Sequence, residues 1–279
     1  MSGPAAPRLD QLGRDLRRLR GEDGVTPDAA IVVPVNAQGH LDTVFGLLAD
    51  LAGYRGQRRF EVVLVVNNFP PGEPPPSGDL EAAGAHVVCL PDTWQPGVAI
   101  CLSARIPGLR AASAAHAVLF DADCRLPDPS ALLDWYVDRF AAGYDLAYTR
   151  VDFYDLRPLW SVRVKVVVHH AARAVRRVVF RMPSTRGSNY GLRRAPLLRL
   201  YDDGLIADDL NVGPTMRAAG ARVAYSSARQ LRVLTSGHKF QGGWARLSRQ
   251  LRYRLLYNLR MLPVRPNDQR HPYHDRKLR

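Results

Sequence analysis

The chain has 279 residues, of which 46% are hydrophobic and 8% aromatic, and its formal net charge is +13 at pH 7. This is the composition of a globular protein, and no apolar run approaches the roughly 20 residues of a membrane-spanning helix. Residues 1–7 carry no apolar segment of the kind that a secretory signal needs, so we expect a cytoplasmic protein made of one large domain with appendages.

Arginine supplies nearly all of the positive charge, since the chain has only three lysines. Nucleic acids, anionic lipids and phosphate-rich substrates would each suit such a charge. The sequence shows no zinc finger, no heptad-backed basic region and no aromatic RNA-binding strand, so nucleic acid is not an expected partner. The three cysteines have no Cys-x-x-Cys spacing and indicate neither a structural zinc site nor a disulfide framework.

The first half of the chain alternates between helical and strand patterns. Leucines at helical spacing predict a helix over 8–20, within an N-terminal extension of residues 1–28. Short apolar runs then predict buried strands at 31–35, 60–66, 85–90 and 117–120, with helices at 41–51 and 98–112. Such alternation predicts an α/β fold in which a mostly parallel central sheet is covered by helices on both faces.

The second half is less regular. Its patterns predict a strand at 145–153, a polar loop at 183–189, a helix at 210–219 and a strand at 222–225. The valine-rich, basic segment 162–182 fits one helix, either a core helix with a solvated basic edge, which we prefer, or a helix at a membrane surface. A helix rich in arginine and aromatics is predicted over 243–262, and a flexible basic tail over 263–279.

Polar side chains gather where the predicted parallel strands end, which is where such sheets bind ligands. They are Asn36, Asn67, Asn68, Asp121 and Asp123. Because alternate strand residues face the same way, Asp121 and Asp123 can point at one cation. Mg2+ and Mn2+ are typically held by one or two carboxylates with water and substrate phosphates, which indicates a nucleoside diphosphate bound through a metal. The alternative is a strand-end turn in which the carboxylates cap backbone donors.

The chain lacks the sequence signatures of two other classes of nucleotide-binding protein. No Gly-x-Gly-x-x-Gly follows the first predicted strand, and there is no Gly-Lys-Ser/Thr phosphate loop. These absences disfavour a dinucleotide-dependent oxidoreductase and a P-loop NTPase.

The order of four motifs resembles that of the inverting, metal-dependent glycosyltransferases with a GT-A fold, often called family 2. The match covers about residues 29 to 230 and rests on Ile31–Val35, Pro96–Leu109, Asp121–Asp123, and Gly187–Arg194 followed by Asp208-Asp209-Leu210. The resemblance implies a three-layer α/β/α GT-A domain over 29–235, with a C-terminal helix in 236–262 that completes the acceptor side.

The resemblance also implies roles for individual residues. Asp121 and Asp123 would hold the donor diphosphate through Mn2+ or Mg2+, and His238 lies where some relatives place a histidine near the metal. Asp209 matches the catalytic base, and the like charge of its neighbour Asp208 is expected to raise its pKa. The other implied donor-binding positions are Pro34, Asn36, Asn67, Asn68, Arg105, Ala122 and Asn189. The alternative for Asp208 and Asp209 is that they only cap the helix that follows them.

Two departures from the family pattern indicate a divergent member. Asn67-Asn68 stands where the family usually has Asp-Asp, and Ile106 replaces the asparagine that usually follows the arginine. Gly243 replaces an arginine that processive relatives carry, which argues against a membrane-embedded polysaccharide synthase.

The sequence thus predicts an enzyme that transfers a sugar from a nucleoside-diphosphate donor to an acceptor hydroxyl with inversion. Arg193, Arg194 and the basic C-terminal helix favour a phosphorylated or lipid-linked acceptor, and the basic helices would allow a peripheral membrane contact. Two alternatives stay open. A nucleotidyltransferase would ordinarily need a basic loop near Asn36, which the chain lacks. A non-catalytic basic protein that binds nucleic acid or acidic membranes would lose affinity with salt and would not depend on Asp121 or Asp123.

Overall fold

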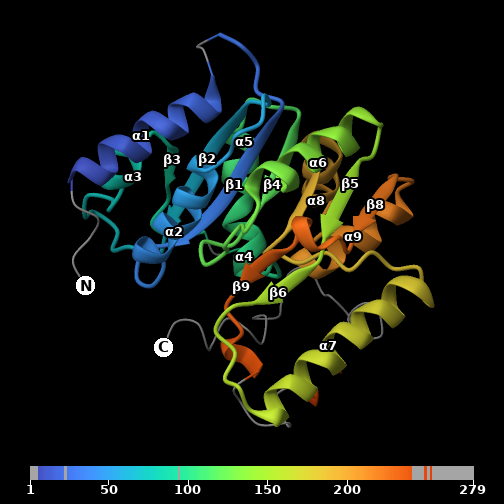
Figure 1. Cartoon of the computed structure of the whole chain (residues 1–279). Coiled ribbons are helices and arrows are strands. Elements are labelled where there is room, and N and C mark those ends of the chain that lie inside the picture. The colour runs from blue at the N-terminus through green and yellow to red at the C-terminus, as the bar shows by residue number, and fades with distance from the viewer. Residues whose placement is uncertain (1–5, 22–23, 94, 241–247, 250–251, 253–279) are drawn as a thin grey trace.

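The computed structural model describes residues 6–21, 24–93, 95–240, 248–249 and 252. A seven-stranded sheet in the order β3-β2-β1-β4-β7-β5-β8 lies between two layers of helices (Figure 1). β7 runs antiparallel to β4 and β5, whereas the other paired strands of this sheet run parallel, so the predicted mostly parallel sheet is confirmed. The strands are β1 (Ala29–Asn36), β2 (Phe60–Asn67), β3 (His86–Cys89), β4 (His116–Leu119), β5 (Leu146–Thr149), β7 (Tyr190–Arg193) and β8 (Val223–Ser226).

Alternate residues of the central strands enter two separate cores. Ile31 and Val33 of β1 belong to the core under α1, α2, α3 and α6, and Val32 belongs to the core under α4, α5, α8 and α9. Gly108 lets α5 approach the sheet closely, because a Cβ there would lie 2.7 Å from side-chain carbons of Val32 and Val65. The helices are α1 (Ala6–Arg20), α2 (Leu41–Ala52), α3 (Gly78–Ala82), α4 (Ile100–Ser103), α5 (Arg105–Ala111), α6 (Pro129–Ala141), α8 (Arg194–Asp202) and α9 (Asp209–Ala218).

A second, two-stranded parallel sheet is formed by β6 (Val151–Phe153) and β9 (Val233–Thr235). Leu234 of β9 also makes an antiparallel bridge to Arg125, just beyond β4, so this small sheet lies beside the carboxylates that follow β4. The predicted strand at 145–153 is therefore two strands that join different sheets, since the ladder between β5 and β8 ends at Thr149. Two short 3-10 helices complete this region, η1 (Arg229–Leu231) and η2 (His238–Phe240).

α7 (Trp160–Val178) lies apart from the three layers (Figure 1). Its buried residues are Val162, Lys165 and His169, and Val162 packs with Phe240 in a small cluster separate from both cores. Its other valines are half-exposed or exposed. The preferred interpretation of this segment as a core helix is therefore wrong, because α7 turns most of its apolar side chains away from the protein.

The two ends of the chain differ in what the structure describes. The predicted N-terminal helix is present as α1. The predicted helix over 243–262 and the basic tail over 263–279 lie outside the described residues, apart from 248, 249 and 252. Among the helices of the described ranges, none combines the length and the apolar character needed to cross a bilayer.

Candidate active site

Asp121 and Asp123 lie directly after β4, at the carboxyl edge of the sheet, and Ala122 between them is buried. Asp121 accepts a hydrogen bond from Ser188 Oγ at 2.7 Å and forms an ion pair with the Arg105 guanidinium. One carboxylate of the pair is thus already balanced by a positive charge inside the protein.

Asp123 is held by the last residue of β9 and by the residue that follows it. Thr235 Oγ1 donates to its Oδ1 at 3.1 Å, and the Ser236 N–H donates to its Oδ2 at 3.3 Å. Burial raises the pKa of Asp123, and the charge of Asp121 raises it further. Because a hydroxyl and an amide bring no formal positive charge, Asp123 would gain more from a bound cation than Asp121 would.

Three asparagines meet at the ends of β1 and β2, as the sequence predicted. Asn36 and Asn67 are register partners in the two strands. Asn36 Oδ1 accepts from Asn68 Nδ2 at 3.0 Å, and Asn68 has a φ of 63°, in the left-handed region that asparagine tolerates better than most residues. Pro34 is tolerated in β1 because the ladder between β1 and β4 ends at Val32, so its missing N–H costs no bond to β4.

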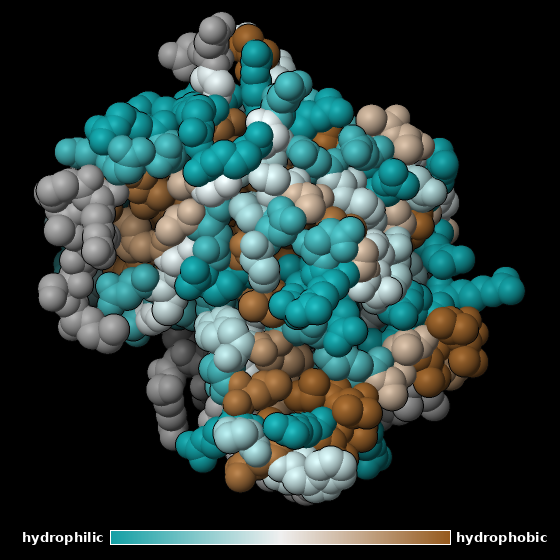
Figure 2. Space-filling view, viewed as in Figure 1, coloured by the Kyte–Doolittle hydropathy of each residue, from teal (hydrophilic) through white to brown (hydrophobic). Residues whose placement is uncertain are grey.

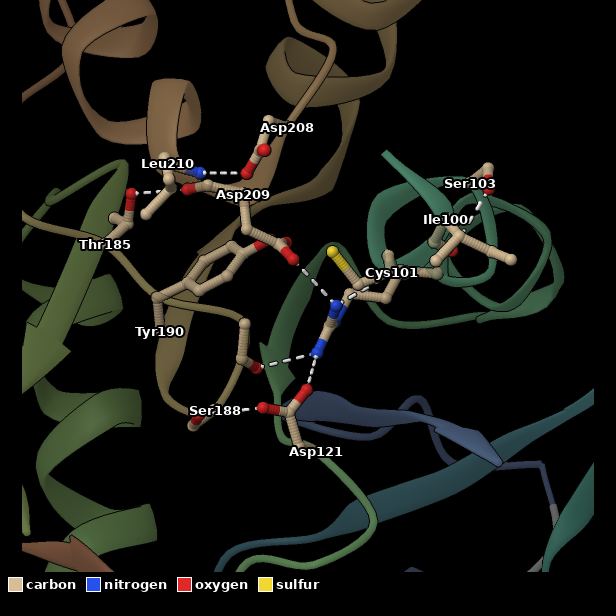
Figure 3. A network of polar contacts seen from close by, with 12 residues as sticks. Ile100, Cys101, Ser103, Asp121, Thr185, Ser188, Tyr190, Asp208, Asp209 and Leu210 are labelled. Carbon is tan, nitrogen blue, oxygen red and sulfur yellow. Dashed lines mark hydrogen bonds and ion pairs between the residues drawn. The ribbon is translucent and has the colours of Figure 1, made fainter. Parts of the chain in front are cut away.

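Arg105 connects the segments that carry the carboxylates. Figure 3 shows Asp121 and Asp209, the two carboxylates that it joins, within one network of polar contacts. Its side chain is 0% exposed. Nη1 donates to Asp209 Oδ2 and to Cys101 O, each at 2.8 Å, and Nη2 donates to Asp121 and, at 2.9 Å, to Gly187 O. Burial lowers the pKa of Arg105, but the charges of Asp209 and Asp121 outweigh burial and raise it overall. Arg105 is therefore a buried, permanent cation whose Nη1 and Nη2 groups donate to protein acceptors.

Asp209 is the first residue of α9 and is 3% exposed. Its Oδ1 accepts from the Tyr190 hydroxyl at 2.7 Å. Burial raises the pKa of Asp209, Arg105 lowers it and Asp208 raises it, with a net rise, so the expected direction of the Asp208 effect is confirmed. Asp208 is the N-cap of α9, because its Oδ1 accepts from the Leu210 N–H at 2.8 Å.

Two further expected site residues lie in contrasting surroundings. Asn189 is 1% exposed; its Nδ2 donates to Thr149 Oγ1 at 2.5 Å and its Oδ1 accepts from the Tyr136 hydroxyl. His238 is exposed, and its Nδ1 lies 3.2 Å from the hydroxyl of Ser236, in the segment that holds Asp123. The structure thus brings His238 to the neighbourhood of the carboxylates, whereas Asn189 is occupied by core partners.

Arg193 and Arg194 lie at the wrong edge of the sheet to serve this site. Because β7 runs antiparallel to β4, Tyr190 is at the carboxyl edge and Arg193 at the opposite one. Arg193 pairs with Asp145 at 3.3 Å, and Arg194 donates to Leu109 O at 2.7 Å. The expectation that Arg193 and Arg194 favour a phosphorylated or lipid-linked acceptor at this site is therefore wrong.

Four residues that hold the carboxylates were not expected from the sequence: Ser188, Tyr190 and Thr235, through their side chains, and Ser236, through its backbone N–H. The first two belong to the motif at 187–194, and the other two come just before His238. The one signal in the sequence that could have identified these residues is their proximity to a motif. Contacts between residues this far apart in the chain produce no recognisable sequence pattern.

The donor set fits a hard divalent cation that keeps several non-protein ligands. Across the described ranges, no three or more His, Cys, Asp or Glu side chains gather as a metal-binding group. Two carboxylates completed by water and phosphate oxygens are the usual arrangement for Mg2+, and Asp121 and Asp123 can supply them. A pocket of about 560 Å³ adjoins Asp123, between α2 and Tyr154, and its volume is in the range of small-molecule sites.

Comparisons with known proteins bear on the fold. No protein-family model and no curated protein sequence matches the chain. The chain is similar to the structure of a mannosyltransferase from Pyrobaculum calidifontis in complex with GDP-Man and Mn2+, with 16% identity, 98% of this chain and 76% of that chain covered, and a TM-score of 0.55. It is also similar to a mannosyl-3-phosphoglycerate synthase from Rubrobacter xylanophilus, with 16% identity, 98% and 88% covered, and a TM-score of 0.50. These likenesses confirm the predicted GT-A fold.

Proposed function

We propose that this GT-A protein is a metal-dependent glycosyltransferase that moves a sugar from a nucleoside-diphosphate donor to an acceptor hydroxyl with inversion. The observation that carries the proposal is the link through Arg105 between Asp121, at the end of β4, and Asp209, a buried carboxylate of α9. It sets a candidate metal ligand and a candidate base beside each other at the edge of the sheet where parallel α/β folds bind ligands.

In this proposal the ends of β1 and β2 bind the nucleoside. Asn36, Asn67 and Asn68 offer both donors and acceptors, so they can pair with the polar edge of a base or with a ribose. Asp123, with Asp121, would hold Mn2+ or Mg2+, and His238 is a candidate further ligand. When bound, the metal neutralises the charge that develops on the leaving diphosphate.

Asp209 would take the proton of the acceptor hydroxyl in a single displacement. Its two oxygens accept from Tyr190 and Arg105, which fix its orientation, and the carboxylate also accepts a hydrogen bond from the Cys101 thiol. Its raised pKa brings it nearer to that of an efficient base, and Arg105 holds it ionised. Asp208 would act indirectly, by capping α9 and by its charge.

The ligands of one similar structure agree with this reaction class. The Pyrobaculum mannosyltransferase was solved with a nucleoside-diphosphate sugar and Mn2+. A hydroxyl-bearing acceptor and a cytoplasmic location stay predictions for the present chain.

Thermal stability in the presence of nucleoside diphosphates tests the donor site. A ligand at 100 times its dissociation constant should stabilise the protein by about 2.7 kcal/mol. We expect this with one nucleotide, in the presence of Mn2+, for the wild type but not for Asp123→Ala. Asp128→Ala is the matched control, because Asp128 caps α6 and does not line the pocket beside Asp123, so this variant should lose stability but keep the nucleotide effect.

The other outcomes are equally decisive. The absence of a stabilising nucleotide would overturn the donor site and favour the non-catalytic basic protein. Nucleotide binding together with a product that keeps the anomeric configuration of the donor, measured by NMR, would overturn the single displacement.

A further inference from the structure

α7 turns its polar side towards the protein and its apolar side outwards. Lys165, Arg173 and Arg176 face the protein, where each donates to a backbone carbonyl oxygen, at 3.2, 2.6 and 3.1 Å. A surface helix normally packs its apolar stripe on the core and leaves its charges in water. The reversed arrangement leaves the apolar stripe of α7 without a cover among the described residues.

The outward stripe consists of large side chains at helical spacing. Trp160, Val167 and Val178 are 77%, 65% and 70% exposed, and Val175 lies on the same face. Phe180, also exposed, follows the end of the helix. Figure 2 shows brown, hydrophobic atoms gathered over the position of α7. Exposed apolar patches of this kind mark surfaces that bind a partner.

The charge around the stripe selects the partner. The chain has no Asp or Glu from Leu156 to Tyr201. Arg157, Arg163 and Arg181 are exposed near the two ends of α7. A partner that covers the stripe should therefore be apolar and carry negative charge at its rim. The basic segment 243–262 and a second copy of α7 would both bring further positive charge.

We propose that α7 lies flat on an anionic lipid bilayer, with the stripe among the acyl chains and the flanking arginines at the headgroups. A helix with one apolar face, flanked by arginines and carrying a tryptophan, has the physical features of a helix that lies in the membrane interface. Each basic residue near an anionic surface strengthens the contact until salt screens it.

Docking through α7 would bring the candidate active site close to the bilayer. Arg173 donates to Ser184 O in the loop before β7, and Arg176 donates to Leu210 O, next to Asp209. This consequence rests on the proposed function: the acceptor hydroxyl would be carried by a molecule held in the membrane.

Co-sedimentation of the full chain with vesicles tests the docking. We expect binding to phosphatidylcholine vesicles with roughly one-third phosphatidylglycerol, weaker binding to phosphatidylcholine alone, and release by salt. The affinity of the Val167→Asp/Val178→Asp variant for these vesicles should be lower than that of the wild type by a factor of about ten or more. Val25→Asp is the matched control, because Val25 is an exposed valine outside α7 and its substitution should leave binding unchanged.

The fluorescence of Trp160, taken as the difference between the wild type and Trp160→Phe, locates the contact. We expect a spectrum typical of water in buffer and a blue shift on anionic vesicles. A blue-shifted spectrum without lipid would show that another part of the chain or a second copy covers the stripe, and would overturn the proposal; so would unchanged vesicle binding by Val167→Asp/Val178→Asp. Nucleotide-dependent stabilisation measured on the same variant separates the two proposals, since each can fail while the other holds.

Discussion

Replacing Arg105 by methionine tests the network at the centre of the site. Arg105 is fully buried and pairs with two carboxylates, Asp121 and Asp209. Removing one partner of a buried ion pair costs about 3–5 kcal/mol, because an uncompensated charge is left behind. Methionine fills much of the arginine volume and is flexible, so a cavity should add little. We expect Arg105→Met to lower the free energy of unfolding by this amount at neutral pH.

Urea denaturation followed by circular dichroism measures the loss. In the Arg105→Met/Asp209→Asn double variant one stranded charge is gone, so part of the stability should return and the two changes should not be additive. The loss in the single variant should also shrink as the pH falls. Without Arg105, the pKa of Asp209 in the folded protein rises further above its unfolded value, so the destabilisation is present at neutral pH and is relieved as Asp209 takes a proton.

An exposed ion pair provides the control. Arg58 is 44% exposed and pairs with Asp138 at 3.4 Å, so Arg58→Met should change stability by less than about 1 kcal/mol. If Arg105→Met were as mild as Arg58→Met, or if the double variant were simply additive, the buried network would not have the energetic role argued for it.

Three further substitutions probe single contacts by urea denaturation. Gly187→Ala should cost about 1–3 kcal/mol, because the new Cβ would lie 2.7 Å from Arg105 Nη2 and 2.8 Å from Asp209 Oδ2; a neutral effect would contradict the tight packing of this loop. Asp208→Ala should cost about 0.5–2 kcal/mol through the lost N-cap, and full retention of stability would argue against the capping role. Burial lowers the pKa of His170 from 6.5 to about 4, so the folded protein resists protonation and stability should fall as the pH drops between these values. The loss of stability over this pH range is at most about 3 kcal/mol, and it should be smaller than that because the His170 side chain is 28% exposed. In His170→Gln, stability should depend less on pH over the same range.

Much of the sheet could be predicted because its strands are buried on both faces. β1, β2 and β4 read as short apolar runs, and their ends brought the expected polar residues to one edge. α6 was not expected, although Asp128 at its N-cap and Pro129 at its first turn are the usual signals of a helix start. The split between β5 and β6 could not be seen, because it depends on which distant strand each one meets.

α7 shows the limit of patterns along the chain. Valines and basic residues at helical spacing establish that the helix is amphipathic. They do not determine whether its apolar face or its basic face packs against the rest of the protein. That choice depends on carbonyl oxygens that lie elsewhere in the fold and accept from Arg173 and Arg176. The role of Arg105 was equally hidden. It was expected to contact the donor, but its side chain is buried and donates to Asp121 and Asp209 instead.

The different surroundings of Asp121 and Asp123 allow ligand binding and structural support to be separated. Asp121 balances Arg105, so Asp121→Ala should disturb the buried network and lower stability as well as any effect of nucleotide with Mn2+. The hydrogen bonds that the structure gives Asp123 come from Thr235 and Ser236, which carry no charge. Because burial and Asp121 raise its pKa, ionised Asp123 is not favoured by its surroundings, and Asp123→Ala should preserve stability at neutral pH or increase it slightly. A variant that is as stable as the wild type but does not respond to nucleotide with Mn2+ would place the cation at Asp123. Severe destabilisation by Asp123→Ala would instead show that this carboxylate supports the small sheet.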